Sequence, residues 1–406
     1  MLVLHVIDFF IASIVWGVIF FLVLNLIFSF LFKYFPNLIS TPQERLRADY
    51  ISRFEGDLKP HVEDWFGLAK GEWEEFSREY KKHELNIYSY EPFCEYKHPA
   101  RSGRFINISD DGFRHGKDQK AWPPQKTNFN IFFFGGSTTL NVGPDKTCIP
   151  SYLQELLNEY RPAKDVAAYN FGRGAYFSTL EKNLFFKLLS EGFKPDLCIF
   201  LDGINDSFFH HGLPATHGVY TAAIDAMNLE ISSQSRNLFR ATPKWNHLKL
   251  FLISLPLFRA ISILIKRKQG VGTQQLAKYT KDEISQVYGR WSANKVQIEA
   301  VARVLSIPVI FVWQPSPAYS YDLECHIALP RHFSLHGHER AREVYQYVKE
   351  RLSNSDKESF VLWLGDIQEH SKEPLYIDTV HYTAKFSKQI ANLIAQYIKE
   401  RGLIRV

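Results

Sequence analysis

A serine stands in a turn of small residues, directly after a run of apolar ones. The run 129–134 predicts a buried strand, and Gly135, Gly136 and Ser137 follow it. In open α/β sheets, ligand sites form beyond the carboxyl ends of the strands. A serine hydroxyl in such a turn can project into that crevice, where a nearby base would make it a nucleophile. Taken alone, a Gly-Gly-Ser turn is more often structural than catalytic.

A base for this serine stands near the end of the chain. Asp378 precedes His381 by three residues, so one turn can bring its carboxylate to the imidazole. In that position the carboxylate would orient the ring and stabilise its protonated form. The same residues could instead cap the helix that follows them. We predict that Ser137 is the nucleophile, His381 the base and Asp378 its orienting partner.

Two further segments follow apolar runs in the same manner. The segment 170–176, with sequence Asn-Phe-Gly-Arg-Gly-Ala-Tyr, follows a predicted strand at 166–171. The segment 203–206, Gly-Ile-Asn-Asp, follows another at 197–201. Each could be a tight turn or an Asx cap. Their occurrence in order with the serine turn and the Asp-His pair favours one common site.

The elements that must position these segments alternate regularly along the chain. Besides the three strands already named, apolar runs at 309–313 and 360–364 are typical of strands. Helical patterns lie between them, at about 152–157, 180–188, 284–305, 338–351 and 385–400. Such alternation predicts βαβ units and an α/β fold of three layers, with a parallel sheet between helices.

Three regions are expected around this pattern: an anchor at 1–36, an accessory region at 37–125 and the catalytic domain at 126–406. The turn-rich Trp122-Pro123-Pro124 suggests the second boundary. An α-rich insertion interrupts the domain at about 207–285. Within it, 248–265 is apolar but contains Arg259, which makes it a poor membrane span. It suits an interfacial helix or a lid, or else a helix buried against the main domain.

The N-terminal region predicts a transmembrane helix. The run 9–32 carries no charged residue, and as a helix it is long enough to cross a hydrocarbon core of about 30 Å. A cleaved signal peptide fits poorly, because no basic segment precedes the run and it is too long. Lys33 and Arg45 follow the run, whereas no Lys or Arg precedes it. The positive-inside rule therefore favours a cytoplasmic location for the catalytic domain.

Composition excludes several other classes of protein. The chain has 406 residues, 46% of them apolar and 22% charged, which is a globular composition. Its net charge of +5 comes without a basic stripe, so we expect no nucleic-acid partner. The four cysteines form no CxxC pair, and the histidines at 210, 211, 332, 336 and 338 suit solvated surfaces. We expect no metal and no cofactor.

Known catalytic motifs of other classes are missing from the sequence. It contains no G-x-S-x-G elbow, no complete G-x-G-x-x-G, no Walker A motif and no H-E-x-x-H. Instead, the four segments together resemble the SGNH (or GDSL) hydrolase superfamily, over about 128–206 and 286–400. This resemblance implies a flavodoxin-like sheet and hydrolysis of esters or thioesters of lipids, sugars or small molecules.

The resemblance also implies an oxyanion hole. Its donors would be the N–H of Ser137, an N–H of the second segment and the side chain of Asn205. The sequence departs from the family at two points. Gly136 replaces the Asp of the GDS motif, and Ala175 stands where the family usually has its oxyanion glycine, with Gly174 one residue earlier. Both Gly174 and Ala175 therefore stay candidates.

Two further segments are similar to a bacterial subset of the superfamily that often carries an N-terminal anchor. They are Gly112-Phe113-Arg114 and Gln314-Pro315, and Gln314 could line the pocket or merely end its strand. In that subset the catalytic domain usually faces the periplasm or the exterior, and this is the location we predict. The positive-inside rule disagrees.

Our functional prediction is a membrane-anchored serine esterase. Its substrate would be an acyl or acetyl ester of a lipid or a glycan, and its partners would be the bilayer and possible membrane proteins. An acyltransferase would use the same acyl-enzyme, with a sugar hydroxyl in place of water. A non-catalytic scaffold in a membrane assembly is the third alternative, although a scaffold has no need of all four site segments.

Overall fold

The computed structural model describes residues 2–35, 58–82, 88–208, 255–268, 278–327, 335, 337–353 and 360–404. The chain divides into two compact units. One consists of Met1–Lys59 with Leu229–Ala277, and the other of Pro60–Asn228 with Lys278–Val406. The second unit thus includes much of the region expected to be accessory. The boundaries at 36 and 125 stay predictions.

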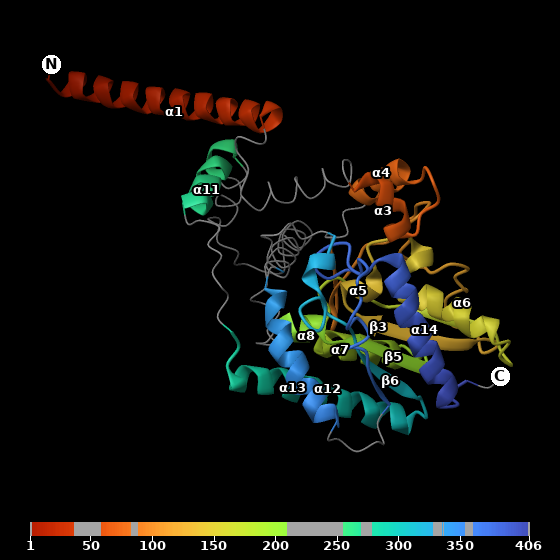
Figure 1. Cartoon of the computed structure of the whole chain (residues 1–406). Coiled ribbons are helices and arrows are strands. Elements are labelled where there is room, and N and C mark those ends of the chain that lie inside the picture. Colours follow the sequence, from red (N-terminus) through yellow and green to blue (C-terminus); the bar gives the residue numbers. More distant parts are fainter. Residues whose placement is uncertain are drawn as a thin grey trace. The chain divides into compact units, whose positions relative to one another are not determined.

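The second unit is built on a five-stranded parallel sheet (Figure 1). Its strands lie in the order β4 (Val166–Asn170), β3 (Phe129–Gly135), β5 (Leu197–Asp202), β6 (Val309–Trp313) and β7 (Val361–Trp363). This order is flavodoxin-like, and its switch point lies beside β3. The predicted fold class is therefore confirmed.

Helices cover both faces of this sheet, as Figure 1 shows. One hydrophobic core joins the sheet to α6 (Ile149–Glu159) and α14 (Ala384–Glu400). The other joins it to α7 (Ser178–Ser190), α12 (Lys281–Val304) and α13 (Ala341–Ser353). Apart from Phe129 at the start of β3, the residues of β3, β5 and β6 are buried, because side chains on both faces of these strands meet a helical layer. The three-layer prediction is confirmed.

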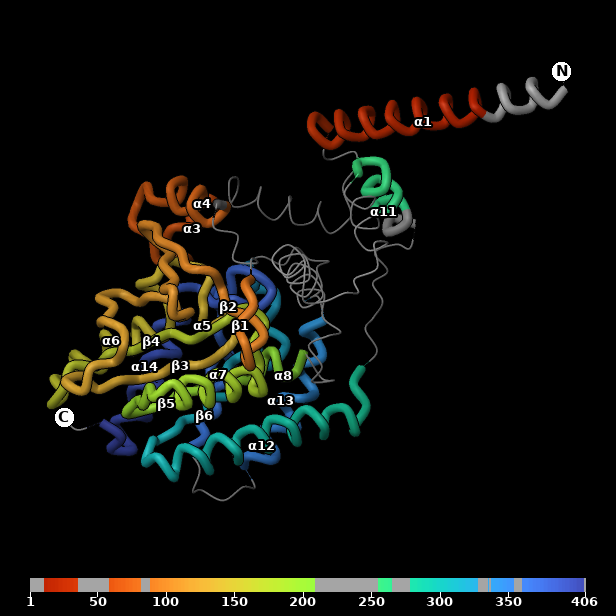
Figure 2. The backbone as a smooth tube through the Cα atoms, turned by 180° about the vertical axis from the view of Figure 1, so that it is seen from behind, coloured from red at the N-terminus to blue at the C-terminus, as the bar shows by residue number. Residues whose placement is uncertain are grey.

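The region before β3 contributes short elements that the sequence analysis did not predict. They are α3 (Lys59–Phe66), α4 (Trp73–Lys82) and a hairpin of β1 (Ser89–Glu91) and β2 (Glu95–Lys97). Figure 2 shows this hairpin on the same side of the sheet as α7. The backbone then bridges Arg101 to Ile108, Ile108 to Arg114 and Arg114 to Asn170, at the end of β4.

A carboxylate of α4 holds the loop that follows this hairpin. Glu79 accepts hydrogen bonds from three successive backbone N–H groups, those of Arg104 (3.0 Å), Phe105 (3.0 Å) and Ile106 (2.8 Å). A carboxylate that accepts several N–H groups forms strong, charge-assisted hydrogen bonds. The described residues between 60 and 125 are therefore bonded to one another and to the sheet, and they belong to the same compact unit as the sheet.

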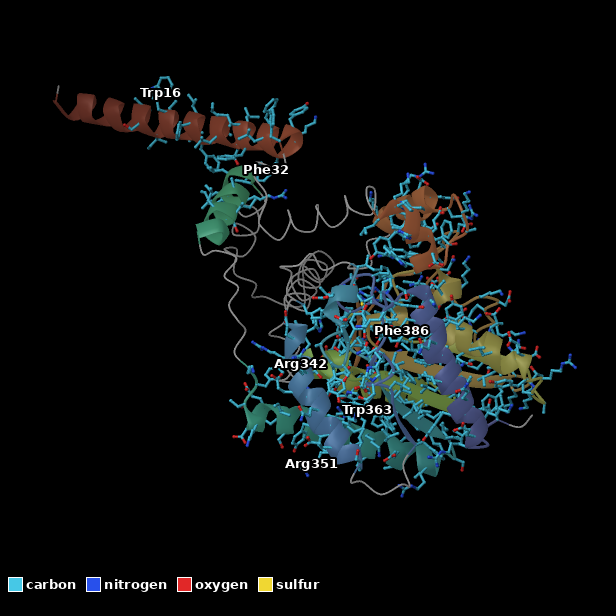
Figure 3. The ribbon with its side chains drawn as sticks, in the orientation of Figure 1. Trp16, Phe32, Arg342, Arg351, Trp363 and Phe386 are labelled. Carbon is cyan, nitrogen blue, oxygen red and sulfur yellow. The ribbon has the colours of Figure 1, made fainter. Side chains whose placement is uncertain are left out.

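The first unit pairs two helices. α1 (Leu2–Tyr34) contains a stretch, Ile11–Tyr34, that is long and apolar enough to cross a membrane, and this stretch is not buried. α11 (Pro256–Lys268) packs against it, and the Asn25 side chain accepts a hydrogen bond from the Leu257 N–H at 3.1 Å. Phe32 lies at the end of α1 near α11 (Figure 3), with the Arg259 guanidinium 4.5 Å from its ring centroid. Most of the predicted insertion, including 248–254, lies outside the described residues.

Three acidic side chains are buried together behind the end of β5. Asp202 accepts a hydrogen bond from the Trp291 indole N–H at 2.8 Å, and Asp206 accepts one from the Ser178 hydroxyl at 2.6 Å. Burial raises the pKa of Asp202 to about 7, and the neighbouring Asp206 charge adds to the effect. Burial, followed by the charges of Asp202 and Asp206, also holds the pKa of Glu181 well above its ordinary value. The folded protein therefore keeps protons that an unfolded chain would release.

Stability is expected to fall as pH rises from about 4 to about 7, because over that range unfolded Asp202 has lost a proton that the folded protein retains. Each such group contributes a slope of about 1.4 kcal/mol per pH unit. Asp202→Asn mimics the protonated carboxyl, so it should flatten the slope and stabilise the protein by about 2 kcal/mol at pH 8. Thermal unfolding between pH 5 and 8 measures this. The exposed Asp165→Asn is the control, and a variant whose slope matched the wild type would contradict the assignment.

Candidate active site

The serine lies where the sequence analysis placed it, at the carboxyl end of β3. It opens the short helix α5 (Ser137–Leu140), and among residues 131–140 it alone is not fully buried. A Cβ on the preceding Gly136 would overlap the Asn205 amide nitrogen and lie 3.0 Å from the Tyr176 carbonyl oxygen. A residue with a side chain at position 136 would therefore require the Asn205 amide to shift.

Asn205 lies in α8 (Ile204–Phe208), beside the serine turn. Its Nδ2 donates a hydrogen bond to the Tyr176 carbonyl oxygen at 2.6 Å, which fixes the orientation of the amide. An amide nitrogen carries two hydrogens, so one remains for another acceptor. The side chain is partly exposed, whereas Asp206 beside it is buried. The structure thus brings Asn205 next to the residue that precedes Ser137.

Nearly all N–H groups of the loop after β4 already donate hydrogen bonds to acceptors in the protein. The bonded donors and their acceptors are Gly172 with Asn170 Oδ1 (2.9 Å), Arg173 with Gly135 O (3.0 Å), Gly174 with His98 Nε2 (3.0 Å) and Tyr176 with Arg173 O (3.2 Å). Within the described part of the chain, the Ala175 N–H has no acceptor. Ala175 is also the one partly exposed residue of this loop, and its φ is +62°. Of the two candidates in the second segment, only Ala175 therefore has an N–H that points to no protein acceptor.

Asp378 and His381 form a bonded pair in the loop before α14. His381 Nδ1 lies 2.6 Å from Asp378 Oδ2 and 2.8 Å from Oδ1. Oδ1 also accepts the N–H groups of Val380 (3.0 Å) and His381 (2.8 Å). The helix cap is Thr383, whose hydroxyl accepts from the Phe386 N–H, so the alternative role of Asp378 as that cap is wrong.

The electrostatics of this pair keep the carboxylate ionised. Burial alone would raise the pKa of Asp378, but the His381 imidazole and the N–H groups of Val380 and His381 outweigh it, and the pKa lies well below its ordinary range. The imidazole Nε2 is buried and has no hydrogen-bond partner in the described residues. A histidine held at Nδ1 by a carboxylate, with Nε2 unbonded, can accept a proton there.

A buried glutamine connects the serine turn to the histidine loop. The side-chain oxygen of Gln314, Oε1, accepts hydrogen bonds from the Thr138 hydroxyl at 2.6 Å and the Tyr382 hydroxyl at 2.8 Å. These two residues are the immediate neighbours of Ser137 and His381. Gln314 is 2% exposed, and its Nε2 donates to the Leu201 carbonyl at 3.2 Å. Its observed position joins the two loops, and direct contact with substrate stays a prediction.

An arginine supports the other side of the serine turn. The buried Arg114 guanidinium donates to the carbonyl oxygens of Leu140 (2.7 Å), Asn141 and Gly143 (2.6 Å), and its Nε donates to Asp145 at 3.0 Å. These are the carbonyls through which α5 ends and the chain turns away. The Gly-Phe-Arg segment is visible in the sequence, but the sequence alone predicts no role for Arg114. Arg114 bonds to a turn about 30 residues away, and no local sequence pattern predicts such a contact.

The metal prediction concerns residues that are only partly described. His210, His211, His332 and His336 lie outside the described residues. Among the residues that the structure describes, no three His, Cys, Asp or Glu side chains are grouped so that they could hold a metal ion. The described site therefore consists of a hydroxyl, an imidazole-carboxylate pair and hydrogen-bond donors.

Comparison with known proteins returned matches only among solved structures. No protein-family model and no curated protein matches the chain. The structural matches include a lipase/acylhydrolase from Enterococcus faecalis, with 12% identity, coverage of 68% of this chain and 97% of that one, and a TM-score of 0.32. They also include the aryl esterase of M. smegmatis, with 13% identity, coverage of 67% and 98%, and a TM-score of 0.31.

A third match is AlinE4, described as an SGNH-hydrolase family esterase. It shares 13% identity, the alignment covers 68% of this chain and 98% of the other, and the TM-score is 0.29. These identities and TM-scores do not transfer the activities of the matched proteins to this chain.

Proposed function

We propose that this protein is a serine hydrolase of the SGNH type that cleaves acyl esters. The observation that carries the proposal is the accessibility of one residue in each segment at the carboxyl edge of the sheet. Ser137, Ala175 and Asn205 are partly exposed between buried neighbours, and the Asp378–His381 pair offers an unbonded Nε2. A nucleophile, a base and oxyanion donors are the groups that acyl transfer requires.

The reaction follows from these groups. The Ser137 hydroxyl oxygen attacks the acyl carbon while His381 Nε2 takes its proton, and Asp378 stabilises the imidazolium. The ester carbonyl becomes an oxyanion, which the N–H groups of Ser137 and Ala175 and the Asn205 Nδ2 stabilise. The imidazolium then gives its proton to the leaving alcohol. Water, activated by the same imidazole, releases the acid from the acyl-enzyme and restores the Ser137 hydroxyl.

Ala175 is favoured over Gly174 as the donor from the second segment. The Gly174 N–H already donates to His98, so it could serve an oxyanion only if that bond were broken. The Ala175 N–H needs no such change. Its positive φ is uncommon for a residue with a Cβ, and such strain often marks functional positions.

The function is tested with the full-length protein in detergent. We expect turnover of p-nitrophenyl acetate and butyrate, and covalent labelling by a fluorophosphonate probe that peptide mass spectrometry assigns to Ser137. Labelling with slow hydrolysis, accelerated by a sugar acceptor, would indicate acyl transfer instead. The absence of both turnover and labelling would refute the hydrolase proposal and favour a scaffold.

We further propose that α1 anchors the catalytic unit to a bilayer, on the extracytoplasmic side. Support comes from its large exposed apolar side chains, such as Trp16 (69% exposed, Figure 3) and Leu26 (70%). A hydrophobic surface of this kind is costly in water and is suited to lipid. An ester of a membrane lipid or of a surface glycan would then be within reach of the site.

Membrane fractionation tests this anchor. The full-length chain should stay with membranes through alkaline carbonate extraction, whereas a chain lacking 1–35 should be released. For the side of the membrane, Val304→Cys places a thiol at an 84% exposed position. Labelling of intact cells by a membrane-impermeant maleimide would support the extracytoplasmic location. Labelling only after lysis would reverse it, in agreement with the positive-inside rule.

A further inference from the structure

The second loop of the site is held by residues that precede the sheet in sequence. The Tyr96 hydroxyl donates to the Gly174 carbonyl oxygen at 2.7 Å, and His98 Nε2 accepts from the Gly174 N–H at 3.0 Å. Tyr96 lies in β2, and His98 follows it. Both are buried, and both bonds span more than 70 residues of sequence. Gly174 is therefore bonded through both of its backbone polar groups.

The bond from Tyr96 to the Gly174 carbonyl determines where the Ala175 N–H points. The Gly174 carbonyl and the Ala175 N–H belong to the same peptide unit, which is planar and trans. In such a unit the C=O and the N–H point in opposite directions. Because Tyr96 holds the carbonyl toward β2, the Ala175 N–H must point away from β2. A rotation of this peptide would break the Tyr96 bond and turn the donor with it.

Other contacts make the arrangement rigid. The buried Arg173 guanidinium pairs with Glu91 of β1 and donates to the Tyr96 carbonyl and the Tyr176 hydroxyl, both at 2.8 Å. A Cβ on Gly174 would lie 2.6 Å from the Tyr88 hydroxyl, so a larger residue at position 174 would displace the Tyr88 side chain, directly before the hairpin. The hairpin is thus packed and bonded against the loop from one side.

We propose that Tyr96 and His98 are positioning residues that aim the Ala175 N–H at the oxyanion. This inference rests on the proposed hydrolase function and adds to it a dependence on residues outside the α/β core. Neither side chain touches the substrate. His98 acts as an acceptor through an unprotonated Nε2, and Tyr96 acts through its hydroxyl alone.

Tyr96→Phe is the sharpest test because it removes one oxygen and keeps the ring. Tyr169→Phe is its matched control, since the Tyr169 hydroxyl is likewise bonded to a backbone carbonyl, that of Ala121 at 2.7 Å, but away from the site. We expect Tyr96→Phe to lower kcat for p-nitrophenyl acetate about 10- to 100-fold with KM changed less than about twofold, since misaimed donors stabilise only the transition state. Tyr169→Phe should keep kcat within about twofold of the wild type, at a similar loss of Tm.

His98 supplies an independent test by rescue. In His98→Gln, the side-chain oxygen can accept from the Gly174 N–H, whereas His98→Leu fills the space without an acceptor. We expect His98→Leu to lower kcat about 10-fold or more, and His98→Gln to retain at least about a third of wild-type kcat. Fluorophosphonate labelling rates of Ser137 should fall in the same order.

Three results would overturn the inference. Wild-type kcat in both Tyr96→Phe and His98→Leu would show that the loop needs neither residue. Equal losses of kcat in Tyr96→Phe and Tyr169→Phe would show that kcat falls because the fold is less stable, not because the Ala175 N–H is misaimed. If the wild type neither turns over p-nitrophenyl acetate nor reacts with the fluorophosphonate, the hydrolase proposal and the positioning inference both fail. If Ser137→Ala abolishes turnover and either of the first two results is found, only the positioning role fails.

Discussion

Ser137→Ala is expected to lower kcat for p-nitrophenyl acetate by about four orders of magnitude or more, because it removes the oxygen that forms the acyl-enzyme in the proposed reaction. His381→Ala should cost about as much, since an unactivated hydroxyl is a weak nucleophile. Ser137 and His381 act together in the same step, so the double variant should be no slower than either single variant. Initial rates with purified protein, together with fluorophosphonate labelling, measure these losses.

The control for this series is Ser190→Ala, at an exposed serine of α7 whose hydroxyl bonds to the Phe186 carbonyl. It should retain wild-type activity. Substantial turnover by Ser137→Ala would place the nucleophile elsewhere in the chain. Turnover by His381→Ala that approached the wild-type rate would remove the histidine from the mechanism and leave Ser137 without a known base.

Asp378→Asn is expected to lower kcat about 10³- to 10⁴-fold with little change in KM. An asparagine amide can donate to His381 Nδ1, which would leave the proton on Nε2, where it blocks acceptance of the serine proton. The change should also destabilise the protein. The pKa of Asp378 is held below its ordinary value, so its ionised form stabilises the fold above about pH 4, and that contribution is lost as pH falls further.

Activity and stability can be separated in this variant. At pH 7, Asp378→Asn should still unfold cooperatively, at a lower Tm than the wild type, while its kcat is almost lost. Between pH 5 and 3 the Tm difference should shrink, because Asp378 of the unfolded wild-type chain gains protons that the folded protein does not bind. A variant with near wild-type kcat would show that His381 needs no ionised partner.

The sequence predicted the sheet well because its central strands are continuous apolar runs. The strand at 309–313 has the predicted bounds, and β3, β4 and β5 each differ from the prediction by one residue at one end. Parallel strands buried on both faces leave a signal that needs no distant information. The four site segments were found for the same reason, since each follows such a strand or precedes an amphipathic helix.

The remaining parts depend on contacts between distant residues, which a single sequence does not reveal. The strands β1 and β2 are three residues each and carry polar side chains, so they have no clear periodicity. Gly174 and Ala175 could not be distinguished, because their N–H partners depend on the fold of the hairpin around His98. Gln314 looked like a strand end, and only the structure joins it to Thr138 and Tyr382.

The bonds that Glu79 makes to the backbone at 104–106 bear on how short a working enzyme can be. A chain cut at residue 126 would keep the nucleophile, the base and every strand of the sheet. It would lose Arg114 from the end of α5 and Tyr96 and His98 from Gly174. Because α4 in turn holds the loop between them, we expect the shortest chain that keeps the proposed site intact to begin near residue 58. Such a chain would start some seventy residues before the α/β framework.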